Sequence, residues 1–249
     1  IINFLKVIGP QTHLMAVCQP TVACLAATAI MSEDKSPDVP ASLTLMAGPI
    51  DVSQSPTKVN ELATSKPLSW FEEKLIGVIP SQFNGVGRKV YPGFLQLMAF
   101  MSMNPDRHVE SFKKLYDYRI SGETEKADAI HDFYEEYFAI MDLSAPFYLE
   151  TIQKVFMDRD LAEGRLTYQG RLVNPKLIKK TFLLTVEGER DDICGIGQTL
   201  AAQDLCSGLP GYMKTHHLQA GVGHYGVFNG KRWDGQIYPV VRNHIQSAL

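Results

Sequence analysis

The sequence predicts an α/β fold in which a mostly parallel sheet is flanked by helices and interrupted by a large helical insertion. Residues 13–47 read as a short apolar strand, a buried helix and a second apolar strand. The same alternation returns from residue 181 onward, whereas residues 51–179 carry few strand signals. Strands joined through a helix by short connections form parallel sheets, so the middle of the chain is expected to be inserted into one sheet.

The first fifty residues supply the predicted strand–helix–strand unit. Residues 1–8 look like the end of an amphipathic helix, which stops at Gly9-Pro10. The first strand follows at residues 14–17. Residues 21–31 are apolar on nearly every side, so this helix is expected to be buried against the sheet. The second strand, residues 41–47, ends at a Gly-Pro pair.

Residues 51–179 are predicted to form a helical lid or cap, and residues 1–50 and 180–249 the sheet-bearing core. Most of the chain's aromatic residues lie in this insertion. Two interpretations of them stay open and can hold together: the rings form the core of a helical subdomain, or some of them face substrate in an apolar cleft. Helical periodicity is clearest at residues 109–120, 126–141 and 145–159.

The segment from Tyr91 to Phe94 is the part of the insertion expected near such a cleft. Pro92 and Gly93 predict a turn that presents one or both rings. Residues 91–104 are also poor in lysine. Tyr91 and Phe94 are therefore candidate substrate-binding residues, and the alternative is that their rings only anchor the insertion to the core.

The α/β pattern returns in the last part of the chain. Apolar strands are predicted at residues 181–186 and 213–218, with a helix at residues 197–205 between them. A charged loop follows the first of these strands, and a glycine-rich loop follows the second. A closing amphipathic helix is predicted at residues 233–248.

Composition excludes several classes of protein. The chain has 249 residues, 45% hydrophobic and 20% charged, which suits one large core with insertions or two domains. The net charge of −3 and the pI near 6.2 argue against a nucleic-acid-binding protein. No apolar run is long enough for a membrane span. The four cysteines lack the spacing of a zinc site or a disulfide framework, so no metal or cofactor is expected and a reducing compartment is favoured.

Cys18 is the candidate nucleophile. It lies at the corner between an apolar strand and a helix that begins near Pro20, a residue suited to the first helical turn. A sharp strand-to-helix corner is the geometry of a nucleophile elbow, which exposes the reactive side chain at the carboxyl edge of the sheet. The small flanking positions hold Ala16 and Pro20 rather than glycine. Taken alone, the pattern also fits a buried small residue.

Asp191 and His224 occupy equivalent places after two later strands. In an open parallel sheet the three loops leave the same edge, where ligands bind. The order nucleophile, acid, histidine is that of α/β-hydrolases. In this chemistry the histidine takes the thiol proton and returns it to the leaving group, while the carboxylate holds the ring and stabilises its charge.

Alternatives stay open for the acid and for the histidine. Asp192 competes with its neighbour Asp191. His216 and His217 compete with His224, although they lie inside a strand pattern. The remaining cysteines are expected to be structural: Cys24, Cys194 and Cys206.

A more specific signal comes from seven segments, residues 16–20, 45–51, 91–96, 101–104, 133–137, 184–189 and 221–228. Together and in this order they resemble the intracellular poly(3-hydroxybutyrate) depolymerases, the polyhydroxyalkanoate depolymerase family of the α/β-hydrolase superfamily. The resemblance runs through essentially the whole chain, so it is far more specific than an elbow pattern alone.

The resemblance implies an α/β-hydrolase fold and hydrolysis of the short-chain polyester of storage granules. It places the family's nucleophile at Cys18, its acid at Asp191 and its histidine at His224. Family members are longer at the N-terminus, so it also implies early strands beyond this chain, including the loop that supplies one oxyanion N–H. The N–H of Gln19 would supply the other.

The resemblance further implies that the partner is the polymer or the granule surface and that the location is cytoplasmic and granule-associated, and it leaves the oligomeric state open. Two other functions stay open. Polyhydroxyalkanoate synthases share the fold and a Cys-Asp-His set, and would transfer hydroxyacyl groups from hydroxyacyl-coenzyme A. A granule-coating protein with an inactive site would bind polymer without hydrolysing it.

Overall fold

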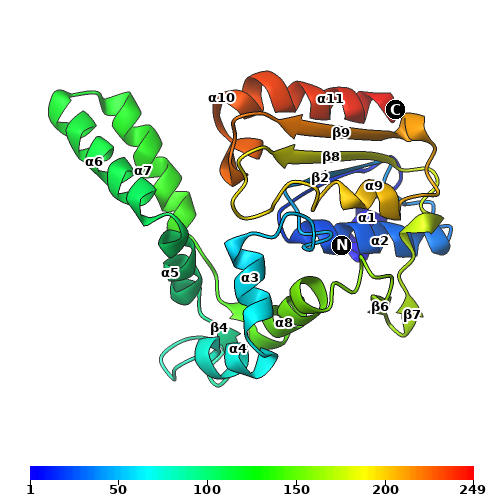
Figure 1. Cartoon of the computed structure of the whole chain (residues 1–249), viewed down its shortest axis with the longest axis horizontal. Helices are drawn as coiled ribbons and strands as arrows, with labels where there is room; N and C mark the ends of the chain where they lie inside the picture. Colours follow the sequence, from blue (N-terminus) through cyan, green and yellow to red (C-terminus); the bar gives the residue numbers. More distant parts are fainter. The chain divides into compact units, whose positions relative to one another are not determined.

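Four parallel strands form the central sheet of the computed structural model, which describes all residues from 1 to 249 (Figure 1). Every neighbouring pair of strands is parallel, so the predicted α/β class with a parallel sheet is confirmed. In their order across the sheet, the strands are β1 (His13–Val17), β2 (Ser42–Met46), β8 (Phe182–Gly188) and β9 (Lys214–Gln219).

By its contacts, the chain divides into two compact units. The first consists of Ile1–Lys66 with Thr151–Leu249 and holds the sheet, and the second is Pro67–Glu150. The second unit is thus shorter than the predicted insertion, because residues 51–66 and 151–179 make their contacts within the sheet-bearing unit. The role of the second unit as a lid stays a prediction.

The sheet-bearing unit surrounds its strands with helices and short connecting elements. No helix of the structure combines the length and the apolar composition needed to cross a bilayer. The elements of this unit are α1 (Ile2–Ile8), α2 (Pro20–Glu33), α3 (Lys58–Ser65), η1 (Ile152–Met157), β6 (Thr167–Tyr168), β7 (Arg171–Leu172), η2 (Pro175–Leu177), α9 (Ala201–Leu205), η3 (Gly211–Met213), η4 (His224–Val227), α10 (Gly230–Arg232), η5 (Trp233–Ile237) and α11 (Tyr238–Ser247).

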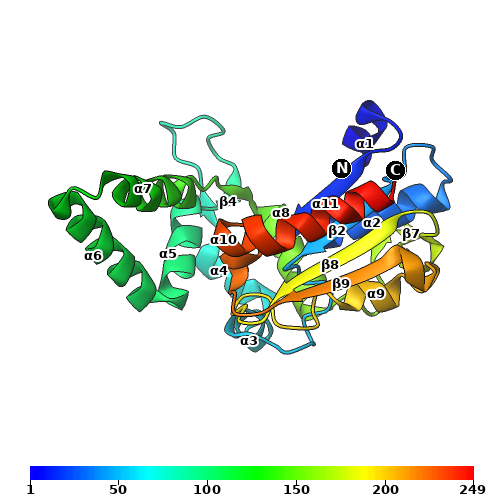
Figure 2. The same ribbon diagram turned by 90° about the horizontal axis from the view of Figure 1, so that it is seen from above.

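The two faces of the sheet carry separate apolar cores. On one face, α2 and α9 contribute to a cluster that includes Leu43 and Leu183. On the other face, α11 contributes to a cluster that includes Met46 and Leu184, and it runs alongside the strands (Figure 2). Successive side chains of a strand point to opposite faces, which is why neighbouring residues such as Leu183 and Leu184 enter different clusters.

The central strands β2 and β8 are buried on both faces, whereas the edge strands are more exposed. All five residues of β2 are buried. Met15 on β1, in contrast, is 51% exposed. Strands covered on both sides read as continuous apolar runs, which is why their positions could be predicted closely from the sequence.

The second unit consists of helices and one small antiparallel sheet, in the order β3-β4-β5. Its helices α6 and α7 lie side by side as a hairpin (Figure 1). Phe112 of α6 stacks on Tyr134 of α7 with ring centroids 4.4 Å apart. The elements are α4 (Leu68–Leu75), β3 (Gly77–Val78), β4 (Lys89–Tyr91), α5 (Gly93–Met103), α6 (Pro105–Ser121), α7 (Thr124–Phe138), β5 (Leu143–Ser144) and α8 (Ala145–Thr151).

Gly48, two residues after the end of β2, allows a close approach between the loop after β2 and α2. A Cβ at this position would lie 2.0 Å from Oγ1 of Thr21, which is fully buried. We therefore expect Gly48→Ala to lower the free energy of unfolding by about 1–3 kcal/mol, the usual cost of overpacking. Urea denaturation of the two proteins measures this difference in the free energy of unfolding.

Gly235 provides the matched control, because it is also helix-associated but open. A Cβ there would meet nothing within 4 Å. Gly235→Ala should leave the free energy of unfolding unchanged or raise it slightly, by about 0.4–1 kcal/mol. Equal effects of the two substitutions would show that the contact between Gly48 and Thr21 is not a tight one.

Candidate active site

Cys18 stands at a strained corner between β1 and α2. Its φ of 64° lies in the left-handed region, which residues other than glycine rarely occupy. Its N–H donates to the Met46 carbonyl at 2.8 Å, and its carbonyl accepts the Thr21 N–H at 3.1 Å and the Thr21 hydroxyl at 2.7 Å. These hydrogen bonds hold the backbone in a conformation that costs about 1–3 kcal/mol. This is the geometry of a nucleophile elbow.

Asp191 lies in the loop after β8 with a buried side chain. Its Oδ1 accepts the backbone N–H groups of Ile193 at 2.9 Å and Cys194 at 2.8 Å. Its Oδ2 accepts the Nδ1–H of His224 at 2.8 Å. One carboxylate oxygen thus fixes the loop, and the other is left to hold the histidine.

His224 lies in the loop after β9, at the start of η4, and is only 6% exposed. The loops after β8 and β9 are tied together by their backbones. The N–H of Glu189 donates to the Gln219 carbonyl at 3.0 Å, and that of Arg190 to the Val222 carbonyl at 2.8 Å. These bonds bring Asp191 and His224 together, although 33 positions separate them in sequence.

The imidazole of His224 is held in its charged form. Burial alone would lower the pKa of His224, but hydrogen bonds to Asp191 and to the Cys18 side chain, with electrostatic interactions with both, raise that pKa to about 10. The structure therefore brings Cys18, Asp191 and His224 into one electrostatically coupled group at the carboxyl edge of the sheet.

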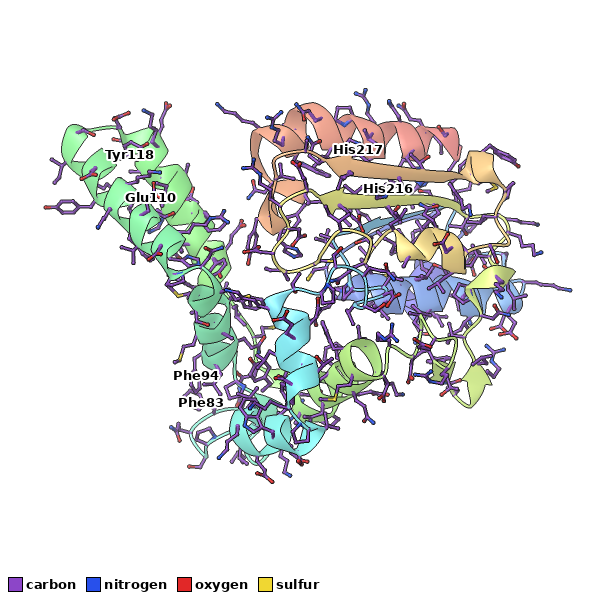
Figure 3. All side chains as sticks on the ribbon, in the orientation of Figure 1. Phe83, Phe94, Glu110, Tyr118, His216 and His217 are labelled. Carbon is purple, nitrogen blue, oxygen red and sulfur yellow. The ribbon has the colours of Figure 1, made fainter.

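The competing residues are placed differently. His216 and His217 lie on β9 itself (Figure 3). His216 Nδ1 lies 3.0 Å from Oγ1 of Thr185, and His217 Nε2 lies 3.0 Å from Oε1 of Gln219. Asp192 is exposed, and it is Asp191 that bonds to His224.

Among the four cysteines, Cys18 is half-buried and the others are buried. Burial raises the pKa of the Cys24 thiol, raises that of Cys206 to about 12, and raises that of Cys194 well above its ordinary value. These three thiols are thus kept neutral and unreactive. No group of three or more histidine, cysteine, aspartate or glutamate side chains is arranged to hold a metal ion.

The N–H of Gln19 is available at the start of α2. It donates to no backbone carbonyl. Gln19 also precedes the first turn of a 14-residue helix, whose N-terminal end favours negative charge. An oxyanion forming beside Cys18 could therefore be stabilised there.

Tyr91 and Phe94 both belong to the second unit, but their environments differ. Tyr91 ends β4, is buried, and packs on Tyr148 with ring centroids 4.1 Å apart. Phe94 lies in the first turn of α5 and is 65% exposed (Figure 3). The sequence reasoning treated these rings alike, whereas Tyr91 is a packing residue of its own unit.

The sequence reasoning did not identify Thr21 as part of the elbow. Its hydroxyl donates to the Cys18 carbonyl three positions earlier, a local bond that threonine commonly makes near a helix start. The sequence feature that could have indicated this bond is a threonine three residues after the candidate nucleophile.

The raised pKa of His224 predicts how stability depends on pH. The folded-state value of about 10 exceeds the ordinary value of 6.5, so the folded state binds this proton more tightly. The resulting stabilisation is complete below pH 6.5 and is lost as pH rises toward 10. Asp191→Asn should flatten this loss in the free energy of unfolding, because it removes the charge that holds the imidazolium. Urea denaturation between pH 6.5 and 10 measures the slope.

Asp192→Asn is the control for this measurement, since it changes the neighbouring carboxylate. It should keep the slope of the unaltered protein. The same slope in both variants would contradict a charged interaction between Asp191 and His224.

Comparisons with known proteins identify the fold and the family. The structure resembles the monoacylglycerol lipase of Paleococcus ferrophilus at 13% identity and a TM-score of 0.50, over 98% of this chain and 72% of that one. It also matches a soluble variant of the Saccharomyces cerevisiae monoglyceride lipase (11% identity, 99% of this chain and 65% of that one, TM-score 0.49) and the α/β hydrolase GrgF of Penicillium sp. sh18 (16%, 99% and 68%, 0.47). The chain thus spans about two thirds of the length of these solved structures.

No curated protein sequence matches the chain. A family model described as the PHB de-polymerase C-terminus, where PHB is poly(3-hydroxybutyrate), matches residues 47–248. This match includes Asp191 and His224, whereas Cys18 precedes it. Because the match covers most of the chain, the protein belongs to the PHB depolymerase family and has the α/β-hydrolase fold of the solved lipases.

Proposed function

We propose that the protein hydrolyses the ester bonds of poly(3-hydroxybutyrate), with Cys18 as nucleophile, His224 as general acid and base, and Asp191 as the carboxylate that holds the histidine. The observation that carries this proposal is the 2.8 Å hydrogen bond from His224 to Asp191, coupled to a cysteine at a left-handed strand-to-helix corner. Membership in the PHB depolymerase family supports the choice of polymer.

In the first half of the reaction, the charged form of His224 carries the proton of the Cys18 thiol on Nε2, and the deprotonated sulfur attacks the ester carbonyl carbon. Negative charge collects on the carbonyl oxygen, near the N–H of Gln19. The C–O bond then breaks, and His224 gives the proton to the departing alkoxide. One product leaves with a hydroxyl end, and the other stays on Cys18 as a thioester.

In the second half, water gives a proton to His224 and attacks the thioester carbon. The C–S bond breaks with its electron pair on the sulfur, the proton stays on Nε2 of His224, and a carboxylic acid leaves. Throughout, Asp191 accepts the Nδ1–H of His224, which keeps Nε2 directed toward the reacting atoms.

The second unit is proposed to contact the polymer as a lid, with Phe94 as one contact. The polyester carries methyl groups and ester carbonyls but no charge, so a matching surface should be apolar. No charged residue occurs between Lys89 and Asp106. The proposed place of action is the surface of cytoplasmic storage granules.

Incubation with amorphous native granules tests the function directly. Soluble 3-hydroxybutyrate oligomers are the expected product. Polymer growth and free coenzyme A from hydroxyacyl-coenzyme A, without oligomers, would instead identify an acyltransferase. Retained granule binding with neither reaction would identify a coating protein with an inactive site.

Cys18→Ala should abolish hydrolysis while leaving the fold intact, because the corner accepts a small side chain. Turnover of granules and of a soluble nitrophenyl ester should fall by about 10⁶-fold. Cys24→Ala is the matched control, since it removes a buried thiol from the same helix region and should leave turnover near that of the unaltered protein. Undiminished hydrolysis by Cys18→Ala would disprove the assignment of the nucleophile.

Phe94→Ala should weaken hydrolysis of granules more than that of a soluble nitrophenyl ester, because only the polymer surface reaches the exposed ring. Its melting temperature should change little, since the side chain is 65% exposed. Tyr91→Ala is the contrasting variant. It removes a buried ring, should cost about 3–5 kcal/mol of stability, and should lower both activities together. Equal losses on both substrates for Phe94→Ala would exclude it as a polymer contact.

A further inference from the structure

Glu187 is a carboxylate that the proposed reaction does not use. It stands near the end of β8, and only 1% of the residue is exposed. A carboxylate removed from water this completely is retained in a fold only when other groups satisfy its charge. Its partners therefore indicate what it does.

The partners of Glu187 are three backbone N–H groups of a single turn. Oε1 accepts the N–H groups of Gly197 at 3.1 Å, Thr199 at 2.8 Å and Leu200 at 2.9 Å. Oε2 accepts the same Gly197 N–H at 3.0 Å. The nearest basic group to these oxygens is Nε2 of His216, which lies 3.9 Å from Oε2. The turn of residues 197–200 is thus held by one buried charge.

This turn continues toward Asp191. The Gln198 N–H donates to the Gly195 carbonyl at 3.1 Å, and Gly195 lies so close to Ser55 that a Cβ would meet its carbonyl oxygen at 2.0 Å. The preceding residue, Cys194, donates its N–H to Asp191 Oδ1 at 2.8 Å. The segment is therefore fixed at its start by Asp191 and at its end by Glu187.

The same turn also continues toward the elbow. The Gly48 N–H donates to Oγ1 of Thr199 at 2.8 Å, and the Thr199 hydroxyl lies 3.1 Å from the Gly48 carbonyl oxygen. Gly48 contacts Thr21, whose hydroxyl donates to the Cys18 carbonyl at 2.7 Å. A continuous chain of contacts thus connects Glu187 to the nucleophile corner.

We infer that Glu187 is a positioning residue that sets the place of Asp191 relative to Cys18 by holding the turn of residues 197–200. Its effect on turnover rests on the proposed function, whereas its effect on the geometry of the three residues does not. The negative charge is essential to the role. In Glu187→Gln an amide NH₂ would replace one of the two oxygens and would face a backbone N–H.

Thr181, directly before the start of β8, provides a matched control at the opposite end of this strand from Glu187. It is 1% exposed, and its hydroxyl donates to the Pro40 carbonyl at 2.8 Å. Thr181→Val removes a buried hydrogen bond far along the strand from the candidate site. Both Thr181→Val and Glu187→Gln should lower the melting temperature. If Glu187 has only a structural role, the two variants should therefore also agree in the reactivity of Cys18.

The test is the alkylation rate of Cys18 with iodoacetamide as a function of pH, with Cys18→Ala setting the background. Glu187→Gln should slow alkylation at pH 7 and shift its pH profile toward that of Asp191→Asn. Thr181→Val should keep the profile of the unaltered protein. On a soluble nitrophenyl ester, Glu187→Gln should lower kcat by about 10²-fold with KM little changed.

Alkylation does not require ester hydrolysis, so the two proposals can fail separately. If the unaltered protein hydrolyses no ester, the alkylation profiles still decide the role of Glu187. Glu187→Asp keeps the charge on a shorter side chain and should lie between the unaltered protein and Glu187→Gln; it also serves if the glutamine variant does not fold. Alkylation profiles of both Glu187 variants that coincide with that of Thr181→Val would overturn the inference.

Discussion

The left-handed backbone at Cys18 is the constraint on which the candidate site depends. A residue with a side chain keeps a positive φ only when its surroundings hold it there. Here the neighbouring strand accepts one backbone bond through Met46, and Thr21 supplies two more. Gly48 then lets the loop after β2 approach Thr21 without a collision. The corner is therefore a property of the packed sheet and helix together.

Two buried carboxylates organise the loop beside this corner, and both are satisfied by backbone N–H groups. One carboxylate oxygen of Asp191 accepts N–H groups of its own loop, and the other accepts the Nδ1–H of His224. Glu187 binds the turn at the far end of the same loop. Asp191 is also paired with the charged imidazole of His224, whereas the charge of Glu187 is matched by the backbone N–H dipoles of its turn. The hydrogen bond and charge of Asp191, together with the interaction with Cys18, raise the pKa of His224 in spite of its burial.

Helix α5 of the second unit buries a polar side chain and exposes apolar ones, the reverse of the usual distribution. Gln96, the one amide of this helix, is buried and donates to the carbonyls of Tyr91 and Met141. Phe94 and Met98 are 65% and 63% exposed. Exposed apolar side chains in such a group commonly mark a surface that meets an apolar partner. The uncharged polyester of the proposed function is a partner of that kind.

The sequence by itself determined the α/β class, the four parallel strands and the order of Cys18, Asp191 and His224 along them. Buried strands and their connecting helix need continuous apolar residues, and such runs can be recognised in short stretches of the sequence. Only the tertiary structure showed that Asp191, and not Asp192, bonds to His224, and that the other two candidate histidines bond elsewhere on β9, because these contacts depend on how loops distant in sequence meet. It also gave Glu187 its partners. A charge within the apolar run of β8 was visible in the sequence, but the N–H groups that satisfy it lie ten or more residues away and take their directions only from the folded turn.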